Sequence, residues 1–186
     1  MKKITLFFAS LAIPFSMSGQ KIVLDSCVDA RDGKVYKAVK IGIQTWMAEN
    51  LSYKCEGSYA FEDQEKNVKK LGRLYSYDVS RNSCPTGWHL PNKSEWNELE
   101  KLLDPKEENV VGDKLAKKAY PGYNAVMTGY KNGKGKYVNK DDATFFWGAD
   151  NVVHLTKDVS GIAYDLYEEL SAKDKKNYFP VRCLKD

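Results

Sequence analysis

The residues best suited to chemistry in this chain of 186 residues are its cysteines. Cys27, Cys55, Cys84 and Cys183 are an even number, which in an exported chain predicts two disulfides with three possible pairings. Zinc is the rival use, but zinc sites usually take two ligands close in sequence, and these cysteines lie far apart. A Cys84–Cys183 bridge would join the middle of the chain to its last strand, and Cys27–Cys55 would then hold the amino-terminal segment. We therefore predict disulfides and no metal site at the cysteines.

His89 is the second candidate, in the string Trp88-His89-Leu90-Pro91. It could act as a general base or a ligand, but a single histidine without a paired nucleophile is a weak signal. We expect Trp88 and Leu90 to be core residues and His89 to hydrogen-bond a nearby backbone group. Arg182, beside Cys183, is expected to be a buried salt-bridge partner. No common catalytic string occurs in the sequence, although a triad assembled in space stays open.

Sugar recognition is the chemistry that the second half of the chain favours. Trp147 could stack on a sugar ring while Asp150 and Asn151 hydrogen-bond its hydroxyls. Tyr130 and Tyr137 flank a lysine-rich turn that could meet an anionic glycan. The structural alternatives are a core strand that ends at Trp147 and a solvated basic edge around the turn.

Calcium is the one cofactor that these residues suggest. Asp141, Asp142, Asp150 and Asn151 could supply oxygen ligands, which calcium prefers. The sequence has neither an EF-hand loop nor a regular acidic spacing, so we expect no cofactor, with calcium as the weaker alternative.

Periodicity predicts the elements that must position these residues. Residues 92–103 read as a helix, with Asn92 as N-cap and Glu95 completing a capping box. Weaker helical patterns occupy residues 71–79 and 111–119. Residues 44–51 are either a strand or a helical turn. Further strands are predicted at residues 35–41, 124–130, 136–139, 144–147, 152–156, 162–166 and 178–184. Helices lie mainly in the first half and strands mainly in the second, which indicates an α+β fold.

Residues 1–19 read as a signal peptide, with Lys2 and Lys3 before a short apolar stretch and Ser16, Ser18 and Gly19 at its end. Cleavage after Ser18 and after Gly19 are close rivals. A single domain, residues 20–186, would remain. No segment approaches the roughly 20 apolar residues of a membrane span. Removing the two lysines lowers the formal charge from +4 to +2, which argues against nucleic-acid binding.

Four blocks of the mature sequence resemble the Fibrobacter succinogenes major paralogous domain. They are residues 29–51 (DARDGKVYKAVKIGIQTWMAENL), 72–75 (GRLY), 84–91 (CPTGWHLP) with Glu95-Trp96, and 179–183 (FPVRC). The resemblance covers nearly the whole mature chain, from about Asp29 to Asp186. That family is known from exported and surface proteins of bacteria, and its biochemical role is not established.

The resemblance implies a C-type-lectin-like fold, because Leu90-Pro91 with Glu95-Trp96 is also similar to a segment of formylglycine-generating enzymes. In that fold the first and last strands pair, two or three helices flank short, mainly antiparallel sheets, and a loop-rich region carries binding. Formylglycine-generating enzymes work through late cysteines that bind copper. Here only Cys183 is late, and as half of a disulfide it would be neither nucleophile nor ligand. The oxidase chemistry is therefore not expected.

Together these observations predict an exported, non-catalytic binding module of a bacterium, secreted, periplasmic or on the cell surface. Its partner would be an extracellular polysaccharide or a surface protein, bound by the loop-rich region at about residues 120–158. The alternatives are an extracellular enzyme such as a glycan hydrolase with a carboxylate pair, and a structural envelope protein.

Overall fold

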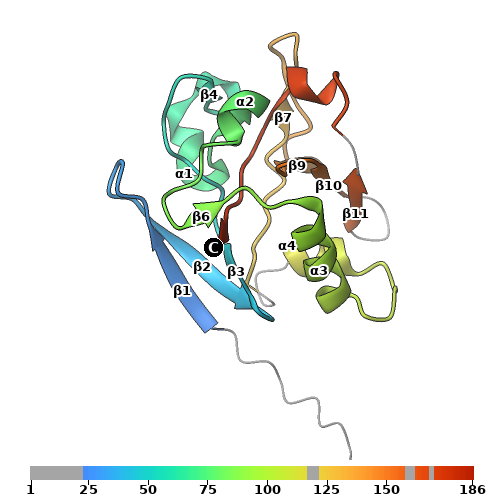
Figure 1. Ribbon diagram of the computed structural model, residues 1–186. Coiled ribbons are helices and arrows are strands. Elements are labelled where there is room, and N and C mark those ends of the chain that lie inside the picture. Colours follow the sequence, from blue (N-terminus) through green and yellow to red (C-terminus); the bar gives the residue numbers. More distant parts are fainter. Residues whose placement is uncertain (1–22, 117–121, 158–161, 168–169) are drawn as a thin grey trace, which may run out of the picture.

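The computed structural model describes residues 23–116, 122–157, 162–167 and 170–186, and the predicted signal peptide lies outside these ranges (Figure 1). Within them, short strands form three sheets with antiparallel pairing, and the helices are few and short. This confirms the predicted α+β class. None of the helices in the described part of the chain is long and apolar enough to cross a membrane.

The first sheet contains both ends of the described chain. Its order is β1 (Val23–Val28), β2 (Val35–Ile41), β3 (Gln44–Met47), β13 (Leu184–Lys185) and β6 (Trp88–His89). The expected pairing of the first and last strands is wrong, because β13 pairs with β3 and β6 instead of β1. Two hairpins join β1, β2 and β3 in sequence order, and β13 adds to the edge of β3 while the outer edge of β1 has no partner among the described strands.

The other described strands form two further sheets. One has the order β4 (Ser58–Tyr59), β5 (Leu74–Ser76), β12 (Tyr178–Phe179), β7 (Tyr130–Lys131) and β8 (Tyr137–Val138). We call it the tyrosine sheet. The other consists of β11 (Ile162–Tyr167), β10 (Val152–Lys157) and β9 (Ala143–Trp147). The predicted strand at residues 178–184 is split at Pro180, which has no N–H to donate to a ladder. Of the predicted strand 124–130, only Tyr130 lies in a strand.

Helix α3 (Lys93–Leu103) confirms the strongest local prediction. The Asn92 side chain accepts from the Glu95 N–H (3.0 Å), and the Glu95 carboxylate accepts from the Asn92 N–H (2.8 Å). Helix α4 (Val111–Ala116) matches the described part of the predicted 111–119 helix, whose residues 117–119 lie outside. The remaining helical elements are α1 (Val68–Leu71), α2 (Tyr77–Ser80), and the 3-10 turns η1 (Phe61–Asp63), η2 (Glu65–Asn67) and η3 (Asp174–Lys176).

The predicted helix at 71–79 does not form as one element: Leu71 ends α1, residues 74–76 form β5, and only residues 77–79 are helical again, in α2. Gly72 is where the first helix ends. Its backbone has φ 72° and ψ −159°, a combination essentially restricted to glycine, and β5 follows at once. A Cβ at Gly72 would lie 2.5 Å from the Asn50 Cβ, so the chain also passes too close here for any side chain.

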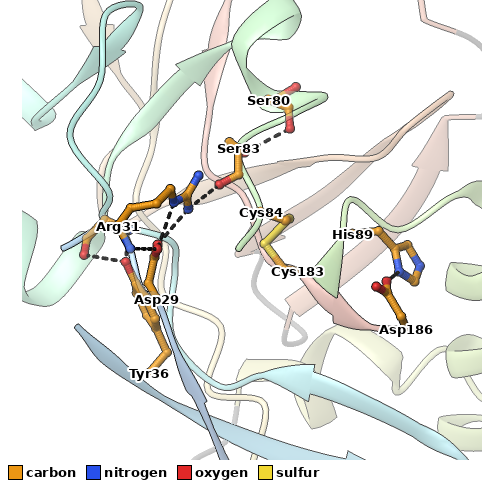
Figure 2. Close-up of a disulfide and its surroundings, with 10 residues drawn as sticks. Asp29, Arg31, Tyr36, Ser80, Ser83, Cys84, His89, Cys183 and Asp186 are labelled. Carbon is orange, nitrogen blue, oxygen red and sulfur yellow. Dashed lines mark hydrogen bonds and ion pairs between the residues drawn. A yellow bond between two sulfur atoms is a disulfide. The ribbon is translucent and has the colours of Figure 1, made fainter. Parts of the chain in front are cut away.

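Cys84 and Cys183 form a disulfide that joins the segment before β6 to the segment before β13 (Figure 2). Their Cα atoms are 5.8 Å apart and the bridge spans 99 positions of sequence. The prediction of a Cys27–Cys55 bridge is wrong, because both cysteines are free thiols in the structure. Cys27 lies in β1 and Cys55 precedes β4, which are edge strands of two different sheets. Burial and the charge of Asp29 raise the pKa of the Cys27 thiol to about 11, which disfavours the thiolate.

Candidate functional site

Three partly exposed tyrosines surround one lysine on a face of the tyrosine sheet. Lys131 Nζ lies 3.6 Å from the ring centroid of Tyr59, 5.2 Å from that of Tyr137 and 5.8 Å from that of Tyr178. The register explains the grouping, since Lys131 of β7 pairs directly with Tyr137 of β8 on one side and Tyr178 of β12 on the other. We call these four residues the tyrosine patch.

Asp63 supplies the negative charge beside the tyrosine patch. The Tyr137 hydroxyl donates to Asp63 Oδ1 (2.6 Å), and Lys131 Nζ lies 3.9 Å from the same oxygen. Burial and the neighbouring carboxylate both raise the pKa of Tyr137. Asp63 has φ 54°, which is the left-handed region that non-glycine residues rarely occupy. The patch thus offers ring carbons, phenol hydroxyls, a carboxylate and an ammonium within one small surface.

The two tyrosines predicted for ligand binding lie on opposite faces of this sheet. Tyr137 belongs to the tyrosine patch, whereas Tyr130 packs its ring against Phe145 and Phe179, with centroids 4.9 and 5.4 Å away. Successive residues of a strand point to opposite faces, so Tyr130 and its neighbour Lys131 are separated. The basic turn is also more than a solvated edge, because the Lys131 side chain is only 14% exposed.

Trp147 and Asn151, also predicted to bind ligand, lie in the interior. Trp147 is completely buried and its Nε1 donates to the Tyr75 carbonyl (2.8 Å), so its prediction as a stacking surface is wrong. Asn151 is completely buried as well. Only Asp150 is exposed, and its carboxylate accepts from the Lys93 N–H at the start of α3 (2.9 Å). Both faces of the strand end at Trp147 are covered by other elements, which periodicity alone does not reveal.

The oxygens considered for calcium do not form a recognisable ligand set. Asp141 and Asp142 are exposed in the turn before β9, while Asp150 follows β9 and lies beside the first residue of α3. Among the described residues, no three acidic, histidine or cysteine side chains gather as a metal site would require.

Three residues beside or within the patch, Tyr59, Tyr178 and Asp63, are not among the predicted site residues. They come from β4, β12 and η1, outside the 120–158 region, whose ends Tyr120 and Asp158 lie outside the described residues. For Tyr59 and Asp63, the aromatic residues in the polar stretch 52–67 are the local signal in the sequence. Their use became visible only through strand pairing.

His89 bonds two carboxylates instead of a backbone group, which corrects the sequence prediction. Its Nδ1 is 2.7 Å from Asp186 Oδ1, and its Nε2 is 2.8 Å from Glu95 Oε1. Figure 2 shows the pair with Asp186 beside the disulfide. Burial lowers the pKa of His89, but the hydrogen bonds to Asp186 and Glu95 outweigh it and raise the pKa overall. Glu95 is also the capping-box residue, so His89 ties the end of β13 to the start of α3.

An acidic cleft of about 300 Å³ lies between α3, α4 and β11. Glu100 and Asp104, one helical turn apart, line it, and so does Tyr164. Burial and the charge of Asp104 raise the pKa of Glu100. Burial would also raise the pKa of Asp104, but backbone N–H donors, including Glu108 (2.9 Å) and Val110 (3.1 Å), lower it overall. The remaining acids of the cleft are Glu107 and Asp165.

Arg182 is buried, and no carboxylate of the described residues lies within 4.0 Å of its guanidinium, so the predicted salt bridge is not seen there. Its Nε donates to Asn50 Oδ1 (2.7 Å), and its other nitrogens donate to the backbone carbonyls of Met47, Tyr123 and Asn124. Asn50 in turn donates to the Leu71 carbonyl and to Thr128 Oγ1. Two of the four blocks that carry the family resemblance therefore meet at one buried junction.

The described residues thus form a disulfide-closed α+β domain that presents a tyrosine patch and an acidic cleft. The chain belongs to the Fibrobacter succinogenes major domain family, whose sequence profile matches residues 39–185. No curated protein and no solved structure matches the chain.

Proposed function

We propose that this protein is an exported, non-catalytic binding module whose ligand is an extracellular polysaccharide. The observation that carries the proposal is the tyrosine patch, where three partly exposed tyrosine rings and Lys131 meet on one sheet face. Tyrosine offers a large apolar surface with a hydroxyl at its tip, which suits the faces and hydroxyls of sugars. Asp63 adds an acceptor that could bind a sugar hydroxyl.

The cell compartment and the scaffold belong to the same proposal. A disulfide persists in oxidising surroundings, which supports a secreted, periplasmic or cell-surface location together with the leader-like residues 1–19. A C-type-lectin-like scaffold is supported by the last strand sharing a sheet with the first and by a bridge that closes that sheet.

Retention on insoluble polysaccharides tests the proposal directly. The mature chain is incubated with a panel of insoluble glycans and a soluble glycan array, with calcium and with a chelator. We expect retention on at least one glycan, and we expect Tyr137→Ala to weaken it about fivefold to tenfold. Tyr53→Ala is the matched control, since Tyr53 is another partly exposed tyrosine, with Arg31 lying 3.9 Å over its ring, outside the patch.

Equal weakening by both tyrosine variants would show that the patch has no special role. Absence of retention on every glycan, with and without calcium, would overturn a polysaccharide ligand and leave a surface protein as the partner to seek.

A second candidate, an extracellular glycan hydrolase, is favoured by the acidic cleft. Glycosidases use two carboxylates whose pKa values are pushed apart, and the pKa of Glu100 is raised while that of Asp104 is lowered. Release of reducing ends from the glycan panel would test it. Glu100→Gln should abolish such release, and Glu108→Gln, an exposed acid outside the cleft lining, should leave it unchanged.

A further inference from the structure

A second cleft, of about 430 Å³, lies beside the buried Arg182 and is unlike the acidic one. Its walls come from β2, the segment after β3, helix α1 and the stretch after Gly122. Five cationic residues line it, Lys34, Lys37, Lys69, Lys70 and Arg182, against one acid, Glu49. We call it the basic cleft.

The charge of Arg182 is stabilised but not neutralised. Among the described residues, every hydrogen-bond acceptor of its guanidinium is neutral: one amide oxygen and three backbone carbonyls. The side chain is 1% exposed, and burial lowers its pKa to about 10. The charge of Glu49 in the same wall favours the cation, but no described carboxylate bonds it directly, so an anion that reaches this wall of the cleft would be favoured.

The lysines around the cleft are not neutralised by acids either. Across the described ranges, none of Lys34, Lys37, Lys69 and Lys70 has an acidic oxygen within 4.0 Å of its ammonium. Lys34 Nζ donates to the Ser52 hydroxyl instead. Glu49 lies in the cleft wall, where its Oε2 accepts from the Lys37 N–H (3.2 Å).

The cleft also holds an acceptor with no donor. Asn124 Oδ1 is buried and finds no hydrogen-bond partner among the described residues, although its Nδ2 donates to the Gly122 carbonyl (2.8 Å). Asn124 lines the cleft, and its own carbonyl accepts from Arg182. An oxyanion placed in the cleft would face the cations, and a hydroxyl on the same molecule would satisfy this oxygen once the Asn124 side chain turns toward the cleft, because the oxygen is buried in the present conformation. Sugars that carry an acidic group combine both features.

We propose that the basic cleft binds an acidic sugar unit through its carboxylate or sulfate group. The cleft volume lies in the range of pockets that hold small ligands. The inference rests on the proposed function only for the polymeric nature of the ligand, since the cleft and the tyrosine patch are different surfaces. Carboxylate and sulfate sugars share the oxyanion, so the experiment has one arm for each.

Binding of oligogalacturonate and of dextran sulfate by the mature chain is measured by calorimetry at low and high salt, with neutral dextran as the reference. We expect at least one acidic probe to bind, and raised salt and inorganic phosphate to weaken it. The double variant Lys69→Gln/Lys70→Gln should weaken binding about tenfold. The matched control is Lys175→Gln/Lys176→Gln, two adjacent exposed lysines in η3 that remove the same charge elsewhere.

Equal weakening of binding by the two double variants would show that only the net charge of the protein matters, and it would refute the cleft as the binding site. Failure of both acidic probes to bind more tightly than neutral dextran would overturn it as well. Tyr137→Ala should leave the acidic probes unaffected. Binding of an acidic probe without retention on any neutral glycan would therefore refute the tyrosine patch as a sugar site and support the basic cleft. Retention on a neutral glycan without binding of either acidic probe would refute the cleft and support the patch.

Discussion

Removing the Cys84–Cys183 bridge should be the most damaging single chemical change to this fold. The bridge closes a loop of 99 positions, and loop-closure entropy for that length is about 4.7 kcal/mol. Strain and residual structure in the unfolded chain reduce such values, so we expect Cys84→Ala/Cys183→Ala to cost about 3–5 kcal/mol. With an m-value of about 2 kcal/mol/M, the urea midpoint should fall by about 2 M.

The assay is urea unfolding followed by tryptophan fluorescence, with and without reductant. Reductant should lower the wild-type midpoint to near that of the double variant and leave the variant unchanged. Cys27→Ala/Cys55→Ala is the control, because it removes two free thiols and no cross-link. We expect it to lose only packing, about 1–2 kcal/mol.

Thiol titration in urea gives the number of free thiols per chain, which tests the disulfide assignment. The oxidised wild type should show two reactive thiols, and the reduced protein four. Four thiols before reduction would mean that the bridge does not form. No thiols before reduction would mean that Cys27 and Cys55 also pair, contrary to the structure. A midpoint unaffected by reductant would refute the stabilising role itself.

Three further predictions concern the buried network and the backbone. The pKa of His89 is raised in the folded protein, so its two hydrogen bonds stabilise the fold fully below about pH 6.5 and lose this effect as the pH rises through the folded pKa. His89→Gln should therefore lower the free energy of unfolding, measured in urea, by about 0.5–1 kcal/mol at pH 5.5, a value that allows for solvent screening, and by less at pH 8.5. Asn50→Ala strands the Nε of buried Arg182 and should cost about 3 kcal/mol, whereas a loss under 1 kcal/mol would contradict the junction. Gly72→Ala should lower stability by about 3 kcal/mol and Gly33→Ala by only about 1 kcal/mol, because both have positive φ but only Gly72 is crowded; equal losses would contradict the crowding.

Local sequence determined the elements whose signals are contained within a few residues. The capping box at Asn92 and Glu95 satisfies N–H groups of its own helix, so it predicted α3 without any distant contact. The strand predicted at residues 35–41 is a second such case, since β2 has the same bounds. The prediction for 71–79 failed where one glycine conformation outweighed a helical spacing of apolar residues.

The tertiary structure alone decided which aromatic residues reach the surface. Tyr137 and Trp147 both lie in short strands. The alternation of side chains along a strand tells only that the residues next to them face the opposite side of the sheet. Tyr137 is partly exposed on the edge strand β8, next to Lys131, which pairs in turn with the distant Tyr178, whereas Trp147 is completely buried. Burial depends on which segments pack over a face, and residues far apart in sequence, such as Tyr75 and Phe179, contribute to the cluster that buries Trp147.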